Sequence, residues 1–334
     1  MTAIKKILIT GGAGFIGYHL SSLLSAQEGY QIDLLDNFQR GMMDSELKHL
    51  LANGKVRLIE RNLLSKGWQK VIDRDYQYIY HLAAIIGVIH VQKRPLEVLQ
   101  NNTLMLIGII DLCREQKDLK RLIFASTSEV YAGTLKHFNM EIPTPETTPL
   151  ALTGLDLPRT SYMLSKIYGE ALCHHSGLPF TIVRPHNLYG PRMGLSHVIP
   201  ELLQRAHATP LPGVLDVFSA DHKRTFCYIR DAVRMMRAVG EMQECIGQTF
   251  NIGNQSPEYT IKDVAKIVLR TVGKDLKIKP GESAAGSPVR RAPDMSKTFR
   301  MTGYVPEVDL EKGIALTYSW YSEKIFDGKQ ESAR

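Results

Sequence analysis

Tyr162 and Lys166 form the pair of side chains in this sequence that is best suited to acid–base chemistry. A spacing of four residues places both side chains on one face of a helix. A phenol ordinarily loses its proton at about pH 10, and a nearby ammonium favours the phenolate. The pair could therefore remove a proton from a bound substrate near neutral pH. The alternative interpretation is an ordinary helix face with a solvated lysine.

Hydroxyl groups and a carboxylate follow an apolar run at residues 122–125, in the order Ser126, Thr127, Ser128 and Glu129. In an open parallel sheet, ligands bind beyond the carboxyl ends of the strands. We therefore expect these side chains to face a cofactor crevice. The alternative for Glu129 is a structural carboxylate that caps the following turn.

Gly11, Gly14 and Gly17 directly follow the first apolar run and precede a helical pattern. The first glycine permits a tight turn, the second lets the backbone approach a pyrophosphate, and the third allows close packing of helix on strand. Asp36 ends the next strand and can accept hydrogen bonds from an adenosine ribose, which favours NAD over NADP. Arg40 lies close enough in sequence to weaken that preference without reversing it.

The order of apolar runs predicts an α/β fold of the Rossmann type, a doubly wound parallel sheet with a smaller, interleaved C-terminal lobe. We assign residues 1–187, with 226–253 returning, to the NAD-binding domain, and 188–225 with 254–334 to the substrate lobe. The proline-rich segment 131–162 is predicted to be a long loop. The expected strands are 7–9, 32–35, 56–59, 78–82, 122–125, 180–183 and 249–252, and the main expected helices are 16–24, 98–113, 161–174 and 310–326.

Bulk composition narrows the class of protein. The chain has 334 residues, of which 44% are hydrophobic and 22% charged, as in globular proteins. Its net charge of +7 suits an anionic ligand or a mildly basic surface, and the absence of long Lys/Arg runs disfavours nucleic acid. The four cysteines are far apart in sequence, so we expect no metal site and a reducing, cytoplasmic location. No apolar stretch of the length of a membrane span was identified, and no membrane association is expected.

The motifs together resemble the extended short-chain dehydrogenase/reductase family, specifically its NAD-dependent nucleotide-sugar epimerases, dehydratases and decarboxylases. The resemblance spans nearly the whole chain. It includes the glycine turn, Tyr162 with Lys166, and the segments 81–84, 126–129, 184–192, 224–228, 251–254 and 290–294.

The resemblance implies roles for individual residues. Tyr162 would take the proton of the sugar C4 hydroxyl, Lys166 would lower the pKa of Tyr162, and Thr127 would hydrogen-bond the C4 oxygen. The family's four-helix interface implies a homodimer through helices 98–113 and 161–174. The implied cofactor residues are Gly11, Gly14, Phe15, Ile16, Gly17, Asp36, Asn37, Leu82, Ala83, Ala84, Asn102, Tyr162, Lys166 and Pro185, and the implied substrate residues are Ser128, Asn187, Arg192, Arg224 and Arg290.

The reaction that follows 4-keto formation is the open question. Glu129, two residues after Thr127, and the segment 190–193 most resemble UDP-glucuronate decarboxylases, whereas the segment 84–90 departs from them. We rank decarboxylation of a UDP-sugar first, C4-epimerisation second and 4,6-dehydration third. A Rossmann protein that senses NAD without catalysis is the non-enzymatic alternative.

Overall fold

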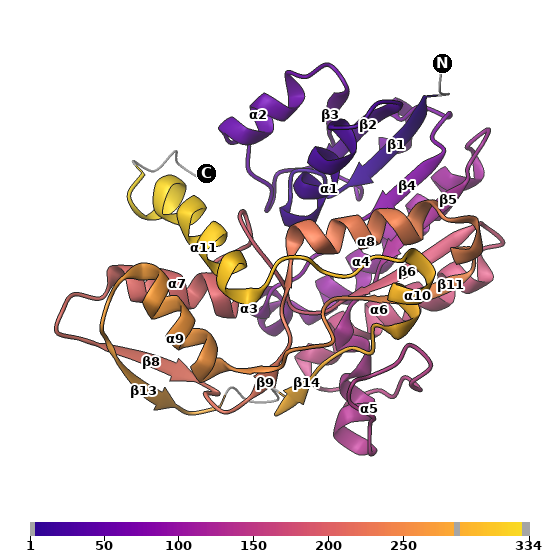
Figure 1. Ribbon diagram of the computed structural model, residues 1–334. Coiled ribbons are helices and arrows are strands. Elements are labelled where there is room, and N and C mark those ends of the chain that lie inside the picture. The colour runs from indigo at the N-terminus through magenta and orange to yellow at the C-terminus, as the bar shows by residue number, and fades with distance from the viewer. Residues whose placement is uncertain (1–3, 284–287, 329–334) are drawn as a thin grey trace.

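A parallel sheet of seven strands, in the order β11-β6-β5-β4-β1-β2-β3, forms the centre of the molecule (Figure 1). The computed structural model describes residues 4–283 and 288–328, so the outermost ends of the two expected lobes lie outside the described residues. All seven apolar runs expected to be strands are strands, and the fold class is confirmed. The strands are β1 (Lys5–Thr10), β2 (Tyr30–Asp36), β3 (Val56–Glu60), β4 (Tyr78–His81), β5 (Arg121–Ala125), β6 (Phe180–Pro185) and β11 (Gln248–Ile252).

Helices cover both faces of this sheet. On one face α4 (Pro95–Arg114) packs against α6 (Pro158–His175), and on the other α1 (Phe15–Ser25) packs against α8 (Ile229–Glu241). Side chains of a strand alternate between the faces. Accordingly Ile7 and Ile9 join the apolar cluster under α1 and α8, while Leu8 joins the cluster under α4 and α6. The sheet is therefore buried on both sides, as parallel sheets require.

Helix α4 is long and apolar enough, by length and composition alone, to cross a membrane. Core helices of soluble domains meet the same criterion. In this fold 44% of its most apolar window is buried, and the helix packs on α6 and β4. One face of α4 is thus buried in the Rossmann layer, while Leu104 and Ile107 on the helix remain exposed.

The second lobe is built from segments on either side of β11. Helices α7, α9 and α11 pack on one another beside two small sheets, β13-β8 and β12-β9-β14 (Figure 1). Their bounds are α7 (Val198–Ala208), α9 (Ile261–Val272), α11 (Leu310–Tyr321), β8 (Val214–Phe218), β9 (Lys223–Arg224), β12 (Tyr259–Thr260), β13 (Lys277–Gly281) and β14 (Arg290–Arg291). The remaining elements are α2 (Ser45–Leu51), η1 (Trp68–Val71), α3 (Val88–Lys93), η2 (Ser128–Tyr131), β7 (Leu188–Tyr189), β10 (Cys227–Tyr228), η3 (Gln243–Cys245), α10 (Ser296–Thr302) and η4 (Ser322–Phe326).

The segment between Tyr131 and Tyr162 is not a loop throughout, as its prolines had suggested. It contains the short helix α5 (Ala132–His137). The hydroxyl of Thr134 donates to the carbonyl of Pro149 and accepts from the backbone N–H of Ala151. These contacts join residues that are distant in sequence, so a local pattern could not predict the helix.

Candidate active site

The glycine turn at the end of β1 forms a cradle in which the backbone leaves little room for side chains at the glycine positions. Gly11 has a φ of +69°, in the left-handed region that favours glycine. A Cβ on Gly17 would lie 2.3 Å from the carbonyl oxygen of Gly11, and a Cβ on Gly14 would lie 3.2 Å from that oxygen. Gly14 also caps α1 without a side chain. The first N–H groups of the helix, which have no partner within it, are thus available to an anion.

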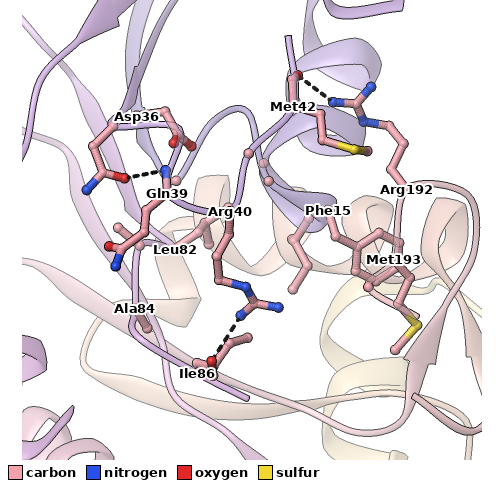
Figure 2. Close-up of a pocket in the computed structure, with 18 of the residues that line it drawn as sticks. Phe15, Asp36, Gln39, Arg40, Met42, Leu82, Ala84, Ile86, Arg192 and Met193 are labelled. Carbon is pink, nitrogen blue, oxygen red and sulfur yellow. Dashed lines mark hydrogen bonds between the residues drawn. The ribbon is translucent and has the colours of Figure 1, made fainter. Parts of the chain in front are cut away.

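A cavity of about 660 Å³ opens above this turn (Figure 2). A dinucleotide fits the donor set, because the glycine cradle lies at one side and a carboxylate, Asp36, at another. The cavity wall contains these residues that were expected to hold the cofactor: Gly11, Gly14, Phe15, Ile16, Gly17, Asp36, Asn37, Leu82, Ala83 and Ala84.

Asp36 is held in place by its own loop. Its carboxylate accepts the backbone N–H groups of Ala13, at 3.0 Å, and Phe38, at 2.8 Å. Burial raises the pKa of Asp36, and the backbone hydrogen bonds oppose that shift. The side chain is fixed at the end of β2, where a ribose hydroxyl would meet it.

Sequence reasoning missed part of the cavity wall. Residues after β3 and residues from the second lobe and its last helix complete it, and apart from Met193 they belong to no motif that the sequence analysis used. Only the tertiary fold brings them to the turn. They are Arg61, Asn62, Leu63, Met193, Trp320, Tyr321, Lys324 and Ile325.

Four residues that were expected at the cofactor are not part of the cavity wall: Asn102, Tyr162, Lys166 and Pro185. The Asn102 amide on α4 accepts from the N–H of Ile85, at 2.7 Å, and donates to its carbonyl, at 3.1 Å. Asn102 therefore fixes the backbone of the segment that follows β4. Pro185 is the last residue of β6.

Tyr162 and Lys166 lie on α6 as the spacing predicts, but their electrostatics differ from the expectation. Burial raises the pKa of Tyr162, although a hydrogen bond with Thr127 and the nearby Arg40 guanidinium lower it. The Lys166 ammonium lies 5.9 Å from the Tyr162 ring centre and donates to the carbonyl of Ala125 at 2.8 Å. Burial lowers the pKa of Lys166 to about 8. Desolvation thus outweighs the charges around the phenol.

Glu129 lies between two guanidinium groups. Its carboxylate is 2.9 Å from Arg291 and 3.0 Å from Arg159. Burial raises the pKa of Glu129, but the two arginines outweigh it, and the net shift is downward. The hydroxyl of Thr127 accepts a hydrogen bond from the backbone N–H of Glu129 at 3.2 Å. One turn therefore positions both the Thr127 hydroxyl and the Glu129 carboxylate. The Glu129 carboxylate thus pairs with Arg159 from α6 and Arg291 from β14. It therefore does more than cap the following turn.

Other expected substrate residues surround this cluster. The hydroxyl of Ser128 accepts from Arg291 at 3.4 Å, and the Asn187 amide donates to the carbonyl of Thr225 at 3.0 Å. Arg224 is buried and pairs in register with Arg291 across β9 and β14. Burial, followed by the charge of Arg291, lowers the pKa of Arg224 to about 10. These contacts concentrate positive charge beside Glu129.

Arg290 and Arg192 have different partners from those expected. Arg290 pairs with Glu258 at 2.5 Å, so the cation beside Glu129 is the next residue, Arg291. Period-two alternation along a strand separates the two side chains. Arg192 pairs with Asp44 and donates to the carbonyl of Met42 at 3.3 Å, and it thereby ties the second lobe to the loop after β2 (Figure 2).

Comparisons with known proteins agree with this geometry. The model of the NAD dependent epimerase/dehydratase family matches residues 7–253. A UDP-N-acetyl-alpha-D-glucosaminuronate decarboxylase of Bacillus cytotoxicus is 31% identical, over 96% of this chain and 98% of its own. UDP-glucuronic acid decarboxylase 1 of Xenopus tropicalis is 28% identical, over 96% of this chain and 73% of its own. The structure of a UDP-glucuronic acid 4-epimerase from Bacillus cereus, with UDP-glucuronic acid and NAD, gives a TM-score of 0.75 at 26% identity, covering 95% and 99% of the two chains.

Proposed function

This chain belongs to the NAD dependent epimerase/dehydratase family, and we propose that within it the protein decarboxylates a UDP-linked uronic acid of the UDP-glucuronate type. It is an NAD-dependent enzyme of nucleotide sugars, as its relatives are. The finer assignment, to decarboxylation, depends on one observation: the carboxylate of Glu129 lies between Arg159 and Arg291 beside Thr127.

That cluster is more than a C4-epimerase requires. Epimerisation at C4 needs only a base for the hydroxyl, a partner for the C4 oxygen and the redox cofactor. Loss of CO₂ from C5 creates a second task, because the new carbanion at C5 must be stabilised and then protonated. The Glu129 carboxylate and the Arg291 guanidinium, next to the C4 site, suit this task. Their charges can hold a group bound to C5 and direct a proton to C5.

The chemistry can be followed at the residues. Bound NAD supplies the reversible oxidation of the sugar at C4. Tyr162 accepts the proton of the C4 hydroxyl, and Thr127 holds the C4 oxygen. The C5–carboxylate bond then breaks, CO₂ leaves, and its electron pair moves into the C4 carbonyl. A proton delivered to C5 beside Glu129 and Arg291 restores the C4 ketone. Tyr162 would return its proton to the C4 oxygen as the hydride returned to C4, so the sequence would be redox-neutral.

The diphosphate of the substrate would lie along the basic residues of the second lobe. Arg224 and Arg291 lie side by side on neighbouring strands, and Asn187 is fixed nearby through Thr225. Arginine suits this role because its planar fork donates two hydrogen bonds at once. This supports a nucleotide-diphosphate substrate, with UDP favoured by the relatives.

C4-epimerisation of the same UDP-uronic acid is the second candidate, and 4,6-dehydration is the third. The observation that favours epimerisation is the similarity to a UDP-glucuronic acid 4-epimerase. Thr127, Tyr162 and Lys166 would suffice for that reaction. In this case the Glu129 cluster would bind the uronate carboxylate and keep it intact.

A substrate panel with product mass as readout distinguishes the candidates. UDP-glucuronate, UDP-N-acetylglucosaminuronate and UDP-glucose are each incubated with the NAD-loaded enzyme. We expect a UDP-pentose-type product lighter than the uronate by the mass of CO₂, with CO₂ released in equal amount. A new isomer of unchanged mass, separated from the starting uronate by chromatography, would contradict decarboxylation and support epimerisation.

Glu129→Gln tests the residue that carries the assignment. We expect a loss of CO₂ release of at least about a hundredfold, as is typical for removal of a positioned acid or base. Glu258→Gln is the matched control, because it breaks the neighbouring Glu258–Arg290 pair with the same chemical change. Equal rates in both variants would show that Glu129 takes no part in the reaction.

We further propose that the enzyme is a cytoplasmic homodimer. Leu104 and Ile107 of α4 and Tyr168 of α6 are exposed, and a shallow apolar groove lies between the two helices. A second copy would cover this face, which sedimentation would detect. All four cysteines are buried and unpaired, which supports a reducing compartment.

A further inference from the structure

Arg40 does not point where its position in the sequence suggests. It follows Asp36 by four residues, which is close enough to contact a phosphate on the adenosine ribose. In the structure its guanidinium extends away from Asp36, across the cavity, and Nη1 donates to the carbonyl of Ile86 at 3.4 Å (Figure 2). The side chain therefore lies over the middle of the cavity and not at the ribose carboxylate.

The loop that carries Arg40 is held down on the glycine turn. Phe38 has a φ of +55°, and a Cβ on Gly41 would lie 2.6 Å from the Cβ of Ala13. Arg192 binds the far end of the loop through Asp44 and the carbonyl of Met42. The backbone at Arg40 is thus fixed at both sides, so the reach of its side chain is set by the fold.

Arg40 differs from the other cations of the cavity wall in its partners. Arg192 is paired with Asp44, Lys324 with Glu323, and Arg61 donates to the carbonyl of Glu60 at 3.0 Å. Among residues 4–283 and 288–328, no carboxylate lies within 4.0 Å of the Arg40 guanidinium. Its one hydrogen bond, at 3.4 Å, is longer than the usual range. A guanidinium with so weak a partner is available to an anion.

The surroundings identify that anion. The first turn of α1 lines the same cavity, and a helix N-terminus with a glycine turn binds phosphate. The charge of Arg40 also lowers the pKa of Tyr162 and that of His197, so the guanidinium lies near both side chains. Its Nη2 would lie 3.7 Å from a Cβ on Gly194. The Arg40 side chain is exposed. The protein around its guanidinium nevertheless removes part of its hydration, which lowers the pKa of Arg40. The guanidinium therefore lies between the adenosine end of the cavity and the catalytic tyrosine.

We propose that Arg40 binds the pyrophosphate of NAD at its nicotinamide-side phosphate, from the side of the cavity opposite the helix α1 N-terminus. The segment after β4, residues 84–87, is apolar and supplies no cation. Arg40, which belongs to the loop after β2, reaches the carbonyl of Ile86 and places a positive charge beside this segment. The inference rests on NAD as cofactor and is independent of which sugar reaction follows.

Calorimetric binding to ligands that each contain part of the dinucleotide tests this assignment without turnover. Arg40→Gln is titrated with AMP, ADP-ribose, NAD, 2′,5′-ADP and UDP. We expect ADP-ribose and NAD to bind about tenfold more weakly or worse, as for a lost hydrogen bond to a charged group. AMP, 2′,5′-ADP and UDP should each change by less than about threefold. Arg40→Lys should recover part of the loss, because it keeps the charge without the fork.

Arg61→Gln is the matched control, because it removes the same charge from the same cavity wall. It should not change the ratio of ADP-ribose to AMP affinity. A selective loss of 2′,5′-ADP binding would instead assign Arg40 to a ribose phosphate, and a selective loss of UDP binding would assign it to the substrate. An equal loss for every ligand, or none, would also overturn the proposal. Thermal melting of the ligand-free variant identifies a folding defect, in which case Arg40→Lys decides the outcome.

Discussion

At the scale of single residues, Tyr162 shows how burial changes the pKa that a neighbouring charge would suggest. The spacing of Tyr162 and Lys166 suggests an ammonium that stabilises a phenolate. In the structure Lys166 binds the carbonyl of Ala125, and burial raises the pKa of the phenol. Thr127 and Arg40 oppose that shift. The phenol is therefore protonated in the ligand-free protein, and it must lose this proton before it can act as the base.

Tyr162→Phe removes the hydroxyl and keeps the ring. We expect turnover to fall by at least about a thousandfold, because both the base and its hydrogen bond with Thr127 are lost. NAD affinity, measured by calorimetry, should change by less than about threefold, since the glycine cradle and Asp36 are untouched. Turnover within tenfold of the wild type would exclude Tyr162 as the base.

The arginines show the limit of sequence reasoning at this scale. Arg290 was expected to contact the substrate, and its neighbour Arg291 was not named. The structure pairs Arg290 with Glu258 and Arg291 with Glu129. The choice depends on the register of β14 against β9, which is a tertiary property.

At the scale of elements, the last helix closes the cofactor cavity. Trp320 donates to Glu46 on α2 at 3.0 Å, and the Tyr321 hydroxyl donates to the carbonyl of Met193. Both residues line the cavity, together with Lys324 and Ile325 of η4. The helix itself could be predicted from its apolar spacing. The contact of this helix with the first lobe could not be predicted, because it joins residues that are more than 270 positions apart in the sequence.

This contact provides an optical test of cofactor binding. Trp320 lines the cavity, whereas Trp68 is buried in the apolar cluster under α4 and α6. We expect NAD to change the tryptophan emission, and Trp320→Phe to abolish most of that change. The variant should also bind NAD about two- to tenfold more weakly, because the hydrogen bond to Glu46 is lost. Trp68→Phe is the control and should retain the response; a response that survives in Trp320→Phe would contradict closure by α11.

At the scale of the whole molecule, buried histidines make the fold sensitive to acid. Burial lowers the pKa of His81 and of His186 to about 3, and that of His19 to about 4. In the unfolded chain each would titrate at about 6.5. Between these values the unfolded state binds more protons than the folded state, so stability is full at neutral pH and is lost as pH falls.

Urea unfolding as a function of pH measures this effect. Three such groups predict a loss on the order of 4 kcal/mol per pH unit between about pH 6 and pH 4. His186→Phe should reduce the slope by roughly a third. The control is His49→Gln, at an exposed position on α2, and it should leave the slope unchanged. A flat profile over this range would show that the buried rings accept protons within the fold.

The two-residue strand β14 has a wider consequence for assigning this site by homology. Both residues of this strand are arginine. A sequence alignment with a relative that is shifted by one position would therefore score almost as well at this strand. It would nevertheless transfer the role of pairing with Glu129 from Arg291 to Arg290, whose side chain faces Glu258. In this chain, the guanidinium beside Glu129 is therefore identified by the pairing of Arg291 with Arg224 in the sheet and not by residue type alone.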